Sequence, residues 1–288
     1  MPLVEQTLLG EVNKVAVAID RLKAFEPPDG YWLAFSGGKD SVVIKRLAEM
    51  AGVKFEAHYS VTSVDPPELV RFIRENHPDV SRDIPRYPDG TPITMWNLIP
   101  KKLMPPTRLA RYCCAYLKET SGRGRVVITG VRWSESSTRK RYQALVRIGE
   151  KKNQIVYNDD NDDTRRAVEQ CYRTRKTMVN PIIDWTDSDV WEFIEKYEIS
   201  YCCLYDQGYK RLGCIGCPMN TNAEKELDAY PKYKAAYLRA FDRIVKERER
   251  RGKQYGIVNW KTAEGVMDWW LHGGGDKDDL TLFAEKGE

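Results

Sequence analysis

A polar loop lies between an apolar run at residues 31–35 and a helix-forming run at residues 41–51. It reads Ser36-Gly37-Gly38-Lys39-Asp40-Ser41. Adjacent glycines let the backbone approach an anion, and amides at a helix start supply hydrogen-bond donors. Lys39 adds positive charge for phosphate, while Asp40 suits a magnesium ion bridged to pyrophosphate. The glycine spacing differs from that of the Walker loop, and the alternative interpretation is an ordinary strand-to-helix junction.

Besides the adjacent Cys202 and Cys203, four of the seven cysteines occur in two close pairs, Cys113 with Cys114 and Cys214 with Cys217. In a reducing compartment, clustered cysteines bind metal or do chemistry more often than they form disulfides. The second pair lies in a glycine-rich turn that suits two thiolates around a compact iron–sulfur cluster. Zinc uses similar pairs, usually two with the same spacing, and remains an alternative. Four packed thiols without a special role are the third interpretation.

A basic segment follows the apolar run at residues 125–131. Gly130 lets a ligand approach the end of that run, and Arg132 and Arg139 can each bind phosphate or sulfate through two hydrogen bonds. The segment therefore predicts a second anion contact, and its alternative is a solvated basic loop.

The hydrophobic pattern alternates between strand-like and helix-like segments. Helices are expected at 3–25, 41–51 and 67–75. A further helix is expected after the cap Thr186-Asp-Ser-Asp189, and it carries Val190, Trp191, Phe193 and Ile194. Strands are expected at 31–35, 54–59, 125–131 and 179–184. This alternation predicts an α/β fold, a doubly wound and mostly parallel sheet with helices on both faces. A helical C-terminal segment follows it. The expected domains are an N-terminal helix (1–29), a nucleotide-binding domain (30–220) with a charged insertion at 149–176, and the C-terminal segment with its polar tail (221–288).

The bulk composition is that of an ordinary globular protein. The chain has 288 residues, of which 42% are hydrophobic and 31% charged, and its net charge is 46 − 42 = +4. No signal-like N-terminal pattern and no long apolar run are present, which predicts a cytoplasmic protein with no membrane contact. A charge of +4 is too small to indicate nucleic-acid binding by itself.

The motifs resemble those of a known family. The loop at residues 36–41 resembles the pyrophosphate-binding loop of the adenine nucleotide alpha-hydrolase superfamily. Residues 111–118, and residues 204–209 leading to Cys214, resemble the segments that hold the 4Fe–4S cluster of assimilatory adenylylsulfate reductases. Residues 129–139 resemble the family's second nucleotide-contacting stretch. Over residues 30–220 the chain thus resembles the phosphoadenosine phosphosulfate (PAPS) reductase and DndC-like family.

The resemblance implies a site for each motif. The nucleotide would be bound by the loop at residues 36–41 together with Gly130, Arg132 and Arg139. The 4Fe–4S cluster would be held by Cys113, Cys114, Cys214 and Cys217. Lys39 and Asp40 are the candidate catalytic residues, with Mg²⁺ accompanying ATP. Cys203 is a further candidate catalytic residue, and Cys202 and Cys171 are candidate extra thiols.

Two reactions are open to this family. Sulfonucleotide reductases make sulfite with a cysteine near the C-terminus, and no cysteine follows Cys217 in residues 218–288. ATP-dependent sulfurtransferases instead split ATP to AMP and pyrophosphate and so activate an acceptor for sulfur insertion. The loop at residues 36–41 retains the full Ser-Gly-Gly-Lys-Asp-Ser motif, which favours ATP, and we take this second reaction as the expectation.

Two further readings belong to other classes, a non-catalytic nucleotide-binding redox sensor and a nucleic-acid-binding module. The nucleic-acid-binding module is indicated by the arginines at 165–175 and 243–251. The expected partners are an adenine nucleotide, a protein that donates sulfur or electrons, and DNA or tRNA as acceptor. The sequence does not indicate an oligomeric state.

Overall fold

The computed structural model describes residues 3–7, 10–135, 146–148, 155–157, 168–171, 176–251 and 260–273. The chain divides into two compact units. The first unit comprises Met1–Ser60, Pro67–Asp83 and Thr120–Leu212, and the second comprises Val61–Pro66, Ile84–Glu119 and Gly213–Glu288. These units do not follow the predicted domain boundaries, because the chain leaves the first unit and returns to it.

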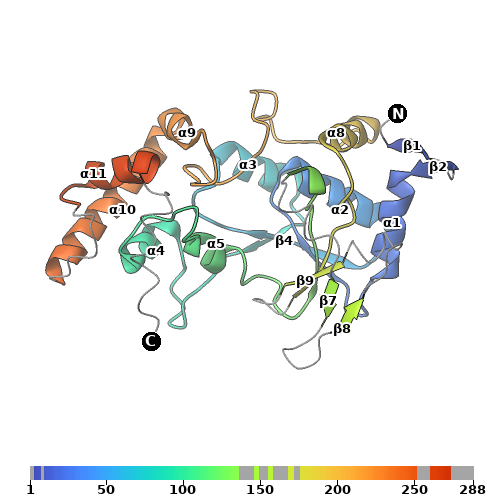
Figure 1. The fold of residues 1–288 in the computed structure, drawn as a ribbon, viewed down its shortest axis with the longest axis horizontal. Coiled ribbons are helices and arrows are strands. Elements are labelled where there is room, and N and C mark those ends of the chain that lie inside the picture. Colours follow the sequence, from blue (N-terminus) through green and yellow to red (C-terminus); the bar gives the residue numbers. More distant parts are fainter. Residues whose placement is uncertain are drawn as a thin grey trace. The chain divides into compact units, whose positions relative to one another are not determined.

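The first unit is built on a six-stranded sheet (Figure 1). Its strands, in spatial order, are β5 (Ser81–Asp83), β4 (Phe55–Ser60), β3 (Tyr31–Ala34), β6 (Val126–Ile128), β10 (Lys176–Val179) and β9 (Val168–Cys171). All neighbours run parallel except β10 and β9. The chain moves outward from β3 in both directions, which is the doubly wound arrangement. The predicted α/β fold with a mostly parallel sheet is confirmed.

Helices flank this sheet: α1 (Lys14–Ala24), α2 (Lys39–Ala51), α3 (Pro67–Asn76) and α8 (Asp187–Lys196), with a short 3-10 turn at Trp133–Glu135. Helix α2 contacts both α1 and α8. Its apolar side, which includes Val43, Ile44 and Leu47, is fully buried. The central strand contributes Leu33, which pairs with Ala57 on one side and Ile128 on the other. These contacts hold the start of α2 firmly at the end of β3.

Three predicted elements were wrong in extent. The strand expected at 125–131 covers only Val126–Ile128. Residues expected to begin the N-terminal helix form an antiparallel hairpin, β1 (Val4–Thr7) and β2 (Gly10–Asn13). Helix α1 starts only after Asn13, whose side chain accepts hydrogen bonds from two amides of the first turn. The strand expected at 179–184 ends at Val179 because the following residues make turns, and Pro181 has no amide hydrogen to donate to a sheet.

The charged insertion is described only in part. A two-stranded antiparallel hairpin pairs β7 (Val146–Ile148) with β8 (Ile155–Tyr157), and β9 lies at the edge of the main sheet. The acidic run at 159–163 and the arginines at 165, 166, 173 and 175 lie outside the described residues.

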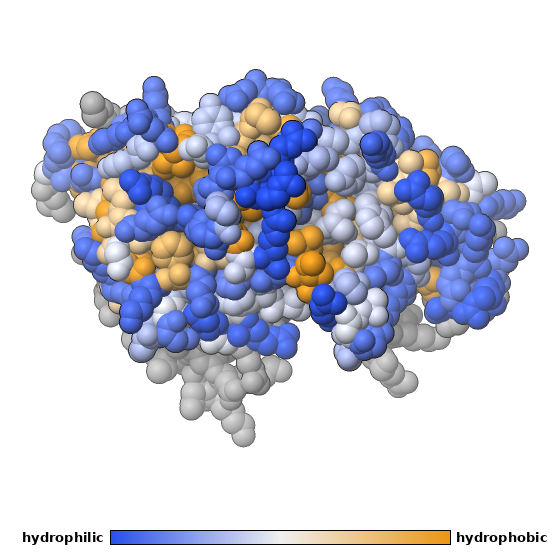
Figure 2. Space-filling view, turned by 180° about the vertical axis from the view of Figure 1, so that it is seen from behind, coloured by the Kyte–Doolittle hydropathy of each residue, from blue (hydrophilic) through white to orange (hydrophobic). Residues whose placement is uncertain are grey.

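The second unit is helical. It contains α4 (Met95–Lys102), α5 (Tyr112–Leu117), α9 (Ala223–Ala229), α10 (Pro231–Arg250) and α11 (Ala263–Asp268), followed by a π-helical turn at Trp269–Gly273. Its core is aromatic and aliphatic, with Tyr237 and Phe241 of α10 packed against Trp270. Within the described residues, no helix has the length and apolar character that crossing a membrane requires. Hydrophilic residues cover most of the face in Figure 2, and apolar residues are scattered among them.

Candidate functional site

The polar loop of residues 36–41 is held in a conformation that requires glycine. Gly37 has φ +74°, and a Cβ atom there would lie 2.7 Å from Leu69 Cδ1 and 2.8 Å from Ile73 Cγ1. Gly38 is the N-cap of the 13-residue helix α2 and has no side chain to cap it. The loop therefore brings backbone close to α3, and the positive end of the α2 dipole lies next to it.

Lys39 is buried at the start of α2, with 4% of its surface exposed. Its amide donates to the Tyr205 hydroxyl at 2.9 Å. Its ammonium group donates to the Lys210 carbonyl at 3.1 Å and lies 3.2 Å from Asp187 Oδ1. Burial raises the pKa of Tyr205, so the hydroxyl stays protonated at neutral pH. The loop thus carries a fixed positive charge inside the first unit.

Arg132 joins this loop from the end of β6 and is only 2% exposed. Its Nε donates to Asp40 Oδ1 at 2.7 Å, and a terminal nitrogen donates to Asp187 Oδ1 at 2.9 Å. Another terminal nitrogen donates to Ser134 Oγ at 3.0 Å. Two buried cations, Lys39 and Arg132, therefore share the Asp187 carboxylate.

The charge state of Asp187 follows from these contacts. Partial burial acts to raise its pKa, but hydrogen bonds and charges from Arg132 and Lys39 outweigh burial, and the pKa lies below its usual range. Asp187 is therefore ionised at neutral pH. Its side chain is 62% exposed, so an incoming anion can compete with it for both cations.

Gly130 allows the end of β6 to approach the first turn of α2. A Cβ atom at Gly130 would lie 2.9 Å from Asp40 Cβ and 3.2 Å from the Asp40 backbone carbonyl. Real Cβ atoms essentially never approach another atom within 2.9 Å, and the 3.2 Å backbone contact is also tight, so a side chain here must displace the start of α2.

We expect Gly130→Ala to weaken nucleotide binding about tenfold, because moving the loop by a few tenths of an ångström misplaces its donors. The free energy of unfolding should fall by about 1–3 kcal/mol from overpacking. Titration calorimetry and urea denaturation measure the two effects. Gly124→Ala is the control for a glycine in open space, since nothing lies within 4 Å of that position, although its φ of +80° adds local strain. Unchanged nucleotide affinity in Gly130→Ala would show that this contact does not position the loop.

The structure brings most of the predicted nucleotide-contacting residues together in the first unit. The loop, Gly130 and Arg132 meet through Asp40, and Arg139 lies outside the described residues. Cys202 is buried and Cys203 exposed in the turn that precedes Tyr205. The side chain of Cys171 is not described.

Sequence reasoning missed Asp187 and Tyr205 as parts of this site. The sequence predicts Asp187 only as part of the cap at the start of α8. Thr186 and Asp189 do form that cap. The exposed carboxylate of Asp187 beside a buried arginine has no local sequence signal.

The four clustered cysteines all belong to the second unit. Cys113 and Cys114 lie in the first turn of α5, while Cys214 and Cys217 lie at the two ends of a turn closed by a 3.2 Å backbone hydrogen bond. Gly216 between them has φ +68°, and a Cβ there would lie 2.9 Å from Trp270. These four thiols are free. The glycine-rich turn is thus packed tightly against the aromatic core.

The thiols influence one another. The hydrogen bond between Cys113 and Cys114 raises the pKa of Cys113 and lowers that of Cys114. Burial raises the pKa of Cys214 to about 11, against the opposing charge of Lys118. The Cys214 sulfur lies 3.7 Å from both Thr62 Oγ1 and Asp65 Oδ1. Lys118 is exposed, and attraction to the charge of the Cys214 thiolate raises the pKa of its ammonium group.

The donor chemistry of this cluster suits a soft metal centre. Thiolates select zinc, Cu(I) and iron–sulfur clusters over hard cations, and a nearby lysine offsets the negative charge that such a centre carries. The four cysteines therefore match a four-thiolate centre in residue type. In the described part of the chain, however, no three or more His, Cys, Asp and Glu side chains are gathered closely enough to hold a metal ion.

Comparisons with known proteins show which family the chain resembles. Residues 30–220 match the model of the phosphoadenosine phosphosulfate reductase domain. An uncharacterised protein of Methanocaldococcus jannaschii is 27% identical over 246 residues, 81% of this chain and 52% of that protein. The chain thus spans about half the length of that relative.

Other relatives carry functional names. The adenosine 5'-phosphosulfate reductase of Bacillus cereus strain Q1 is 25% identical over 194 residues, 65% of this chain and 72% of that protein. Among solved structures, the phosphoadenylyl-sulfate reductase of Candida auris aligns at 17% identity with a TM-score of 0.45, covering 68% of this chain and 87% of that one. The match to the domain model covers well over half of the residues, and the chain belongs to the phosphoadenosine phosphosulfate reductase domain family.

Proposed function

We propose that this chain is an iron–sulfur, ATP-binding enzyme that splits ATP to AMP and pyrophosphate and so activates an acceptor for sulfur insertion. The first unit would bind the nucleotide at residues 36–41, and the four cysteines of the second unit would hold the cluster.

The observation that carries the choice of ATP is the pair of carboxylates beside Arg132. Asp40 and Asp187 each bond a different nitrogen of that guanidinium, next to the glycine-rich loop. Enzymes that handle nucleotide phosphates use one or two carboxylates plus the phosphates themselves to hold Mg²⁺. Hard oxygen donors at the head of an anion-binding loop fit a magnesium–ATP substrate. When bound, the ion would neutralise part of the charge on the departing pyrophosphate.

The chain's own residues supply the remaining contacts. Amides of the loop and the start of α2 would bind the phosphate oxygens, with Lys39 and Arg132 as buried counter-charges. An acceptor oxygen would attack the α-phosphorus, the bond to the bridging oxygen would break, and pyrophosphate would leave to the loop. The outer sulfur of a persulfide on exposed Cys203, received as sulfane sulfur from a sulfur-donor protein, would then attack the acceptor carbon and expel AMP. A second thiol would cleave the resulting disulfide, which leaves the sulfur on the acceptor and Cys203 in a disulfide with that thiol.

A second candidate is the reduction of adenylylsulfate or its 3′-phosphorylated form to sulfite. The names of the Bacillus relatives favour it. Both candidates use the same anion-binding loop and the same cysteine cluster, and they differ in the nucleotide and in the need for Mg²⁺.

A product assay separates the two candidates. The full chain, purified without oxygen, is incubated with Mg²⁺-ATP and, in parallel, with adenylylsulfate and a thiol reductant. AMP and pyrophosphate from ATP in equal amounts support the proposal. Sulfite from adenylylsulfate, with no pyrophosphate from ATP, would replace it by the second candidate. Nucleotide binding with no product in either arm would favour a redox sensor.

Metal content tests the cluster. We expect about four irons and four labile sulfides per chain in the anaerobically purified protein. Cys113→Ser and Cys214→Ser should each lower iron below about one per chain, because a cluster with three thiolates is labile to loss. Cys203→Ser is the matched control, since Cys203 lies outside the cluster unit, and it should retain full iron. Stoichiometric zinc without iron would contradict the iron–sulfur assignment.

A further inference from the structure

Helix α10 of the second unit has two faces of opposite character. Its buried residues are Tyr237, Ala240, Phe241 and Ile244, which pack into the unit's core. Its exposed residues, apart from Pro231 and Glu249, are all basic: Lys232, Arg239, Arg243, Lys246 and Arg250. These five positions follow the spacing of one helix face. We call this face the basic surface.

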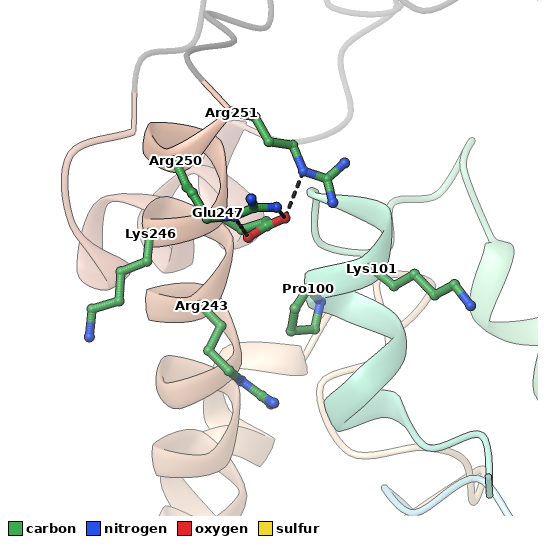
Figure 3. A pocket seen from close by; sticks show the side chains of 7 residues that line it. All are labelled: Pro100, Lys101, Arg243, Lys246, Glu247, Arg250 and Arg251. Carbon is green, nitrogen blue, oxygen red and sulfur yellow. Dashed lines mark hydrogen bonds and ion pairs between the residues drawn. The ribbon is translucent and has the colours of Figure 1, made fainter.

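The C-terminal end of α4 extends the basic surface into an open pocket of about 430 Å³. Figure 3 shows the side chains that line it, with Arg243 extending toward α4 and the amino groups of Lys101 and Lys246 pointing outward. The lining residues are Pro100, Lys101, Arg243, Lys246, Glu247, Arg250 and Arg251. Five of them are cations and one is a carboxylate, so the pocket has a large excess of positive charge.

Much of this charge is not neutralised within the unit. Glu247 bonds Arg250 and Arg251, both at 2.7 Å, and these contacts lower its pKa to about 2. Arg243 donates to the Trp96 carbonyl, and the Lys101 ammonium lies 3.8 Å from the centre of the Tyr87 ring. A carbonyl group and an aromatic ring carry no net charge, so these contacts do not neutralise Arg243 or Lys101.

Lys246 pairs with Asp242 at 2.7 Å, but both side chains are largely exposed, at 72% and 47%. Such a pair is weak and exchanges readily for another anion. The cations around the pocket are therefore available to a ligand.

Helix electrostatics explain only part of the pattern. Cations in the last turn of a helix are favoured by its dipole, which accounts for Arg250. The dipole does not favour Lys232 in the first turn, nor Arg239 and Arg243 in the middle. A small anion would not use the whole row either, because the 18 residue steps from Lys232 to Arg250 extend about 27 Å. That length matches about eight steps of a nucleic-acid strand at about 3.4 Å each.

We propose that the basic surface of α10, with Lys101 of α4, binds the phosphate backbone of a nucleic acid. Taken with the proposed function, on which this step rests, the acceptor for sulfur insertion is then a nucleic acid. Phosphate contacts of this kind give affinity and orientation without reading sequence.

The test measures binding of the full chain to a fluorescein-labelled 20-base-pair DNA duplex and to labelled tRNA, by anisotropy at several salt concentrations. Arg239→Gln combined with Lys246→Gln removes two charges and leaves the Arg243–Trp96 contact intact. Each cation that neutralises a phosphate contributes about −0.9 to the slope of log affinity against log salt. We expect the double variant to bind about tenfold more weakly and its slope to become shallower by about 2.

The matched control is Arg74→Gln with Lys196→Gln, two exposed cations on α3 and α8 of the first unit. It removes the same charge and should bind within about twofold of the unmodified chain. Equal losses in both double variants, or no binding of either nucleic acid by the unmodified chain, would overturn the proposal. The arm with the higher affinity at 150 mM salt identifies DNA or tRNA as the source of the backbone.

Release of pyrophosphate from ATP, measured on the same preparations, separates this proposal from the function it extends. Binding that depends on α10 without pyrophosphate release would leave the surface standing and refute the ATP reaction. Pyrophosphate release without nucleic-acid binding would do the reverse.

Discussion

Arg132→Ala should abolish nucleotide binding and destabilise the first unit at the same time. Arg132 is the partner of Asp40, whose side chain is 23% exposed, and removing it leaves that carboxylate without its counter-charge. Breaking a fully buried pair costs about 3–5 kcal/mol. Solvent screening at Asp40 and Asp187 reduces this, so we expect the free energy of unfolding to fall by about 2–3 kcal/mol. Affinity for ATP should drop at least about 100-fold, because a charged bidentate donor is lost.

Urea denaturation measures the loss in the free energy of unfolding, and calorimetry measures the loss of affinity for ATP. Adding Asp40→Asn to Arg132→Ala removes the uncompensated charge, so part of the stability should return while ATP binding stays lost. Arg74→Ala is a surface control, with a 62% exposed side chain, and should stay within about 0.5 kcal/mol. Unchanged stability and ATP affinity in Arg132→Ala would refute the role of this residue.

Gly37→Ala should have the second large effect. The new methyl group would lie 2.7–2.9 Å from Leu69 and Ile73, and the backbone has φ +74°. The left-handed conformation costs about 1–2 kcal/mol for alanine. Overpacking adds about 1–3 kcal/mol. We therefore expect a loss of about 2–5 kcal/mol in the free energy of unfolding, with loss of ATP binding, measured as for Arg132→Ala.

Gly52→Ala is the matched control at the other end of the same helix. Gly52 has φ +67° but nothing within 4 Å of its Cβ position. It should show only the conformational cost, about 1–2 kcal/mol, and should bind ATP normally. Equal losses of ATP binding in Gly37→Ala and Gly52→Ala would mean that ATP binding does not depend on close packing of the loop against α3.

The parts of this molecule that the sequence predicts are those governed by local chemistry. Two glycines between an apolar run and a helix-forming run led directly to the loop at the start of α2, and alternating segments led to the parallel sheet. The helix cap formed by Thr186 and Asp189 was likewise predicted from residues that are neighbours in the sequence.

The missed features depend on residues distant in the chain. Arg132 meets Asp40 across 92 residues and Asp187 across 55. No periodicity or motif in the sequence encodes those pairs. The cysteine pairs were recognised from spacing, but only the fold shows that Cys113, Cys114, Cys214 and Cys217 belong to the helical unit and not to the sheet. The N-terminal hairpin was missed because helical spacing of apolar residues outweighed the Asn13 cap.

If residues 36–41 hold the phosphate chain of ATP, as we propose, the protein must bind ATP more tightly than AMP. Calorimetric titration of the full chain with ATP and with AMP, each with Mg²⁺, tests that claim in one measurement. The two additional phosphates should make charge-assisted hydrogen bonds of about 1.5–3 kcal/mol each. We therefore expect ATP to bind at least about 100-fold more tightly than AMP, and Gly37→Ala to abolish the difference. Equal affinities for ATP and AMP in the unmodified chain would contradict the account.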